Sequence, residues 1–124
     1  IFKRTDIKTE NTIHANFKNV IEPVLCTKLK NENGVSVSTV EHLMAAFYGE
    51  GIDNALVEVD APEIPIMDGS AVDFVDAIKL VGSEEQKEPK KFIKVLKKVK
   101  IQDLSFFSFA DLTNFYNLCK NDIL

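Results

Sequence analysis

Length, composition and charge describe a small globular chain. Its 124 residues are 45% hydrophobic and 27% charged, which suits about one domain with a packed core. The formal net charge of −4 gives no global reason to expect nucleic acid or an anionic membrane as a partner. No stretch approaches the roughly 18 apolar residues of a spanning helix, so we expect no stable membrane insertion. Two cysteines, Cys26 and Cys119, without a C-x-x-C pair favour a reducing cytoplasm over a disulfide framework.

The first part of the chain predicts short strands and then a helix. Residues 1–8 and 12–20 have extended patterns separated by turn-forming residues. Side chains alternate over 25–30, and Asn33-Gly34 follows as a tight turn, which together predict a β-hairpin. A helix is expected from about 39 to 48. Its apolar stripe consists of Val40, Leu43, Met44 and Phe47, and Gly49 and Gly51 follow it.

The next part predicts a strand, a second helix and another strand. "ALVEVD" (55–60) alternates as a half-buried strand does. A helix is expected over 71–81, with Ser70 as its N-cap and Gly82 as its end. The predicted buried face of this helix consists of Ala71, Phe74, Val75 and Ile78. After a polar linker, "KFIKVLKKVKIQD" (91–103) reads as a strand. The sum is an α+β fold in two layers, a mostly antiparallel sheet with two helices on one face.

The last 21 residues differ in style from the rest. Residues 104–124 hold four of the nine phenylalanines and contain no glycine or proline. We therefore expect a first domain over 1–89, a strand over 90–103, and an atypical tail over 104–124 that marks a frameshift or truncation junction.

The dipeptide Glu41-His42 admits a structural and a catalytic interpretation. Ser38 and Glu41 have the spacing of a capping box, in which each side chain bonds the main-chain amide of the other. Alternatively, His42 is a zinc ligand and the adjacent carboxylate takes a proton from water on the metal. The second histidine of the familiar helical zinc motif is replaced by Ala46, so His42 supplies one ligand at most. Spacing alone leaves both interpretations open.

Two further features have competing explanations. Cys26 could act as a nucleophile with His14 or His42, although a cysteine among apolar strand residues is more often a small buried side chain. A run of lysines after residue 86 could attract a diphosphate, or could instead form a solvated strand face that protects an exposed edge. These lysines are Lys87, Lys90, Lys91, Lys94, Lys97, Lys98 and Lys100.

Several motifs resemble one known family. "STVEHL", "GIDN" and "APEIPIMDGSA", with "RTD" and "LCT" as looser matches, make the chain similar to the UDP-3-O-acyl-N-acetylglucosamine deacetylases over about residues 1–103. These are zinc amidases that commit bacterial precursors to lipid A. The resemblance implies two domains of similar α+β topology that enclose the active site, with this chain forming most of the first.

The resemblance also implies roles for individual residues. His42 would be a zinc ligand and Glu41 the general base that acts on zinc-bound water, while Leu25 and Cys26 would line the pocket of a small-molecule UDP-acylglucosamine substrate. The remaining zinc ligands, including an H-x-x-x-D pair, are expected on a C-terminal domain that this chain lacks. We therefore expect this chain to be inactive alone. The alternative is a non-catalytic α+β module in which Glu41-His42 only caps a helix.

Overall fold

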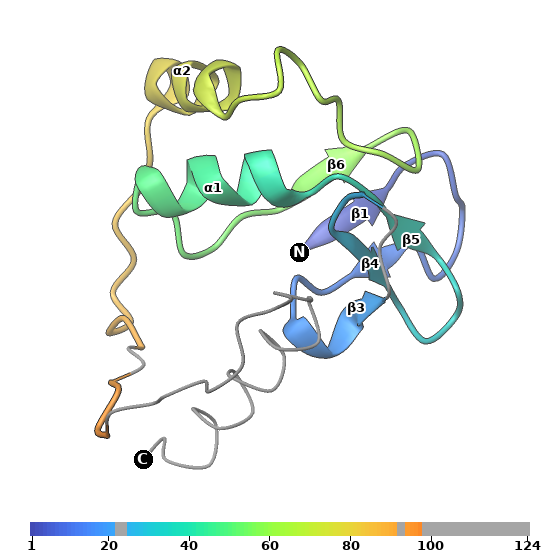
Figure 1. Ribbon diagram of the computed structural model, residues 1–124, viewed down its shortest axis with the longest axis horizontal. Coiled ribbons are helices and arrows are strands. Elements are labelled where there is room, and N and C mark those ends of the chain that lie inside the picture. The colour runs from blue at the N-terminus through green and yellow to red at the C-terminus, as the bar shows by residue number, and fades with distance from the viewer. Residues whose placement is uncertain (22–24, 92–93, 98–124) are drawn as a thin grey trace, which may run out of the picture. The chain divides into compact units, whose positions relative to one another are not determined.

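The computed structural model describes residues 1–21, 25–91 and 94–97. The chain divides into two units, Ile1–Gln86 and Lys87–Leu124, and the helices and strands of the described residues all lie in the first (Figure 1). Within the described ranges, no helix is both long enough and apolar enough to cross a membrane.

The first sheet has three strands in the order β2-β1-β6. These are β1 (Phe2–Arg4), β2 (Thr12–Ile13) and β6 (Val57–Val59). β1 pairs antiparallel with β2 and parallel with β6. Alternation along β1 buries Phe2 and Arg4 and leaves Lys3 half-buried. The ammonium of Lys3 lies 2.8 Å from the carboxylate of Glu58 on β6.

The second sheet is antiparallel, in the order β3-β4-β5. It contains β3 (Val20–Ile21), β4 (Lys28–Lys30) and β5 (Ser36–Val37), and a short 3-10 helix, η1 (Phe17–Asn19), precedes β3. The predicted hairpin is confirmed, with Gly34 at φ +86° in its turn. Asn31 closes this turn, because its side-chain oxygen accepts from the amides of Asn33 and Val35.

Arg4 connects the two sheets. Its side chain is buried, and Nη1 donates to the main-chain oxygen of Ser36 on β5 at 2.7 Å. Its Nε and Nη2 donate to the two carboxylate oxygens of Asp6 at 2.8 and 2.6 Å. This paired geometry lowers the pKa of Asp6, chiefly through the hydrogen bonds from Arg4. Each nitrogen of the buried guanidinium thereby donates a hydrogen bond, which offsets the cost of burying the charge.

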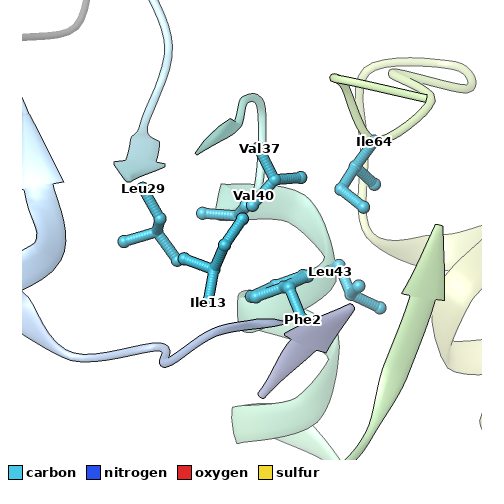
Figure 2. Packing of buried hydrophobic residues seen from close by; sticks show 7 residues of the cluster. All are labelled: Phe2, Ile13, Leu29, Val37, Val40, Leu43 and Ile64. Carbon is cyan, nitrogen blue, oxygen red and sulfur yellow. The ribbon is translucent and has the colours of Figure 1, made fainter. Parts of the chain in front are cut away.

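One apolar core joins both sheets to the first helix. Figure 2 shows its side chains pointing toward one another from β1, β2, β4, β5, α1 and the loop after β6. Its buried members are Phe2, Ile13, Leu29, Val37, Val40, Leu43 and Ile64. Short strands therefore suffice here, because each contributes one or two side chains to a shared core.

Two helices complete the first unit, α1 (Glu41–Gly49) and α2 (Val72–Val81), and they pack against each other (Figure 1). On α1, Leu43 and Ala46 are buried while Met44 is 39% exposed. The buried face of α1 is therefore rotated slightly relative to the predicted apolar stripe. The four residues predicted to face inward are half-buried, three of them on α2 and Ala71 directly before it. Phe74 packs against the core. Gly82, at φ +77°, follows the helix as predicted.

The α+β class is confirmed, with two helices and mostly antiparallel strands. The strands form two small sheets where the sequence suggested one, and residues 25–27 do not extend β4. The strand expected over 91–103 is absent from its described residues, 91 and 94–97. Its other residues, and the atypical tail at 104–124, lie outside the described part of the chain, so the expected domain boundaries stay predictions.

Candidate functional site

Glu41 is the first residue of α1, and its carboxylate is held by the loop before β4. The main-chain amide of Thr27 donates to Oε2 of Glu41 at 2.9 Å. In return, the amide of Val40 donates to the main-chain oxygen of Thr27 at 3.3 Å. This pair of bonds explains why Thr27 does not extend β4, because its main-chain amide and oxygen pair with the start of the helix instead.

The predicted capping box is wrong. Val40 occupies the N-cap position of α1 and no side chain caps the helix. The amide of Ser38 donates to the main-chain oxygen of Pro62 at 2.9 Å, so it is not available to Glu41. The interpretation of Glu41-His42 as a mere helix cap therefore loses the contact on which it depended.

The second predicted N-cap is displaced by one position. Ala71 precedes α2 and no side chain caps it at that position. The hydroxyl of Ser70 accepts from the amide of Val72 at 3.2 Å, and Asp68 Oδ1 accepts from both the amide and the hydroxyl of Ser70. These bonds from Ser70 are the main reason why the pKa of Asp68 is lowered.

His42 follows Glu41 on α1 and is half-buried. Its Nδ1 is buried and has no hydrogen-bond partner among the described residues. Buried ring nitrogens are normally satisfied, so this atom suits a group that the described residues do not supply. An electrostatic interaction with His42 is the smallest of the causes that lower the pKa of Asp68.

Leu25 and Cys26 lie in the same loop before β4. Leu25 has φ +63° and a fully exposed side chain, while Cys26 is a half-buried free thiol. Both precede Thr27, which bonds Glu41 directly. The structure thus brings the loop of Leu25 and Cys26 to Glu41, although these residues were predicted from the family resemblance and not from spacing.

A complete metal site is not formed by the described residues. Within 1–21, 25–91 and 94–97, no three His, Cys, Asp or Glu side chains cluster as metal ligands. His14 borders two surface hollows, one with polar residues around Asn31 and one beside Phe47 and Ile52. Neither hollow is lined by Glu41 or His42. The unpaired Nδ1 of His42 would suit one ligand position of a metal, and the assignment of His42 as a zinc ligand stays a prediction.

Three site features were missed in the sequence. Thr27 holds the catalytic candidate through its main chain, which no side-chain pattern reports. Thr39 has φ +57° and donates to the carboxylate of Glu63, although nothing in "VSTVEH" signals a left-handed residue. Asp68 was not singled out in the sequence, because its interaction with His42 depends on how the segment after β6 returns to α1.

Comparison with known proteins identifies the class. The family model described as "LpxC: UDP-3-O-acyl N-acetylglycosamine deacetylase" matches residues 1–116. A UDP-3-O-acyl-N-acetylglucosamine deacetylase from Actinobacillus succinogenes is 54% identical over 103 residues, which are 83% of this chain and 34% of that protein. Proteins of the same name from Pasteurella multocida and Shewanella violacea are 53% and 48% identical over the same lengths.

The family model and these three relatives point to the same family of proteins. The chain belongs to the LpxC family of UDP-3-O-acyl-N-acetylglucosamine deacetylases. It spans about a third of the length of the curated relatives it matches.

Proposed function

We propose that this chain contributes the general base and one zinc ligand to a deacetylase. The reaction is hydrolysis of the N-acetyl group of UDP-3-O-(3-hydroxyacyl)-N-acetylglucosamine, the committed step of lipid A biosynthesis, in the cytoplasm. The observation that carries the proposal is the pair Glu41-His42, whose carboxylate is oriented by Thr27 within a chain that matches the family over residues 1–116.

His42 is proposed to hold zinc. The imidazole is a good zinc ligand, and its buried Nδ1 lacks a partner in the described part of the chain. Zinc, when bound, would lower the pKa of a water molecule and polarise the acetyl carbonyl. Catalytic zinc normally takes three protein ligands, so the others are proposed to come from the C-terminal part of a full-length protein.

Glu41 is proposed to move the proton. Its carboxylate takes a proton from the attacking water, whose oxygen then bonds to the acetyl carbon. The C–N bond breaks, acetate leaves, and Glu41 returns the proton to the sugar amine. The bond from Thr27 to Oε2 orients the carboxylate and restricts its rotation, which is the kind of positioning that catalysis needs.

Leu25 and Cys26 are proposed to line the substrate pocket. The exposed side chain of Leu25 and the half-buried thiol of Cys26 lie in the loop that bonds Glu41 through Thr27. A residue that lines the pocket must lie close to the catalytic carboxylate and be accessible to the substrate. Cys26 would contribute shape there and not nucleophilic chemistry.

The test compares two proteins. One is this chain alone, and the other is a chimera in which this chain replaces the 103 residues that it matches in the Actinobacillus succinogenes deacetylase. We expect the chimera to hold zinc and release acetate, and residues 1–124 alone to do neither. Stoichiometric zinc and turnover from residues 1–124 alone would contradict the count of ligands.

Within the chimera, Glu41→Gln should lower kcat by about 10²- to 10⁴-fold, the usual contribution of a general base. Glu58→Gln is the matched control, since Glu58 is an exposed partner of Lys3 on β6. Full turnover by the Glu41→Gln chimera would contradict the role proposed for this residue.

A further inference from the structure

The residue that directs the chain into α1 has an unusual backbone. Thr39 lies two positions before Glu41 and has φ +57°. A β-branched residue is a genuine outlier in the left-handed region, and such conformations persist only where the surroundings hold them. They also concentrate at functional sites. A tertiary contact is therefore expected to hold Thr39 in this conformation.

Glu63 holds Thr39 through a short hydrogen bond. The hydroxyl of Thr39, a residue only 4% exposed, donates to Oε1 of Glu63 at 2.6 Å. A bond from a hydroxyl to a charged acceptor is among the stronger hydrogen bonds. It connects residues 24 positions apart in the sequence, so it is a tertiary contact and not a local turn.

The main chain around Glu63 is itself fixed. Ser38 and Glu63 form a parallel bridge. The amide of Ser38 donates to the oxygen of Pro62 at 2.9 Å, and the amide of Ile64 donates to the oxygen of Ser38 at 3.0 Å. Ile64 is 3% exposed and belongs to the core. The carboxylate of Glu63 therefore reaches Thr39 from a rigid support.

No side chain caps the start of α1, where Val40 occupies the N-cap position. The chain there is held by the bond between Val40 and Thr27, by the side chain of Val40 in the core, and by the bond from Thr39 to Glu63. These contacts together set the direction of the first turn. That first turn carries Glu41 and His42. A change at Thr39 would move both groups together and would strain the bond from Thr27 to Glu41.

We propose that Glu63 is a positioning residue for Glu41 and His42, acting through the hydroxyl and backbone of Thr39. The role in turnover rests on the proposed deacetylase function. The contact itself does not, because it concerns only the geometry at the start of α1. Glu63 touches no reacting atom in this scheme.

The first experiment measures geometry in residues 1–124 without any activity. Hydrogen exchange of the Thr27 amide reports its bond to Glu41. Glu63→Ala should speed this exchange about tenfold, a change within the range of local opening energies. Glu63→Gln, which keeps an acceptor oxygen, should restore much of the protection, and Glu58→Ala should leave it unchanged. Equal protection in Glu63→Ala and the parent chain would overturn the proposal.

The second experiment measures turnover in the chimera described above. Glu63→Ala should lower kcat by about 10- to 100-fold with a smaller change in KM, as misplacement of catalytic groups does. Thr39→Gly removes the hydroxyl while tolerating positive φ, so it should stay folded and show the same loss. Thr39→Ser keeps the hydroxyl and should retain most of the turnover.

The outcomes separate the two proposals. If Glu41→Gln abolishes turnover while Glu63→Ala and Thr39→Gly change only the melting temperature, Glu63 has a structural role and the positioning proposal is wrong. If Glu41→Gln leaves turnover intact, the proposed function fails, whereas the exchange result in residues 1–124 still decides the contact between Glu63 and Thr39.

Discussion

The main-chain amide of Thr27 lies 2.9 Å from Oε2 of Glu41 and donates a hydrogen bond to it. The two residues come from different parts of the first unit, a loop before β4 and the first turn of α1. This bond gives Glu41 a structural contact in addition to its proposed chemistry, so the two contributions can be measured separately.

Substitutions of Glu41 should separate stability from catalysis. Glu41→Gln keeps an oxygen that accepts from Thr27, so the stability of residues 1–124 should change little. Glu41→Ala leaves that half-buried amide without its acceptor and should cost about 1–3 kcal/mol. Urea unfolding measures both. If the two variants were equally destabilised, the bond to Thr27 would not be the reason for the loss.

The two histidines should differ in their effect on zinc. In the chimera, His42→Ala should lower zinc content, because the removal of one of three protein ligands weakens a catalytic site. His14→Ala is the matched control: His14 borders the two surface hollows, and neither contains Glu41. Zinc content by atomic absorption decides this, and equal content in the two variants would exclude His42 as a ligand.

Arg4 should be more important for stability than its neighbour Lys3. Arg4→Met leaves the oxygen of Ser36 and the carboxylate of Asp6 without their donors, at a cost of about 1–3 kcal/mol. Lys3 makes an exposed ion pair with Glu58, and Lys3→Met should change stability by less than about 1 kcal/mol. Unfolding of both variants in urea compares them, and similar losses would contradict the bridging role of Arg4.

Stability should fall in acid partly through Asp6. The pKa of Asp6 lies below its ordinary 3.8 because Arg4 hydrogen-bonds its carboxylate. A lowered folded-state pKa contributes stability above the unfolded pKa, and this contribution is lost as pH falls through the folded pKa. Asp6→Asn should therefore flatten the dependence of stability on pH below about 4. Urea midpoints at a series of pH values measure this, and an unchanged slope would contradict the assignment.

The core should depend on Phe2 far more than on the surface of α2. Phe2 is 1% exposed and Leu80 is 86% exposed. Phe2→Ala should cost about 3–5 kcal/mol through lost burial and a cavity, while Leu80→Ala should stay within about 0.5 kcal/mol. Thermal unfolding followed by circular dichroism compares the two. A large loss in Leu80→Ala would show that this face of α2 is covered in solution.

Local sequence patterns determined several elements of this protein. The alternation in β6, the Asn33-Gly34 turn and the inner face of α2 follow from side-chain periodicity and turn chemistry, which act between near neighbours. The motifs around Glu41-His42 also indicated the family, which the match over residues 1–116 confirms. Periodicity predicts helices and strands because the apolar side chains of an element must share one face to be buried, whatever the position of that element in the fold.

Tertiary structure alone decided the partners of the polar groups. Ser38 and Glu41 have the spacing of a capping box, yet Ser38 pairs with Pro62 and Glu41 with Thr27. The left-handed Thr39 is held by Glu63 from a distant segment. A local pattern states which bonds are possible, but the packed core brings competing donors and acceptors from far along the chain. Here they took both partners of one capping-box bond, the amide of Ser38 and the carboxylate of Glu41.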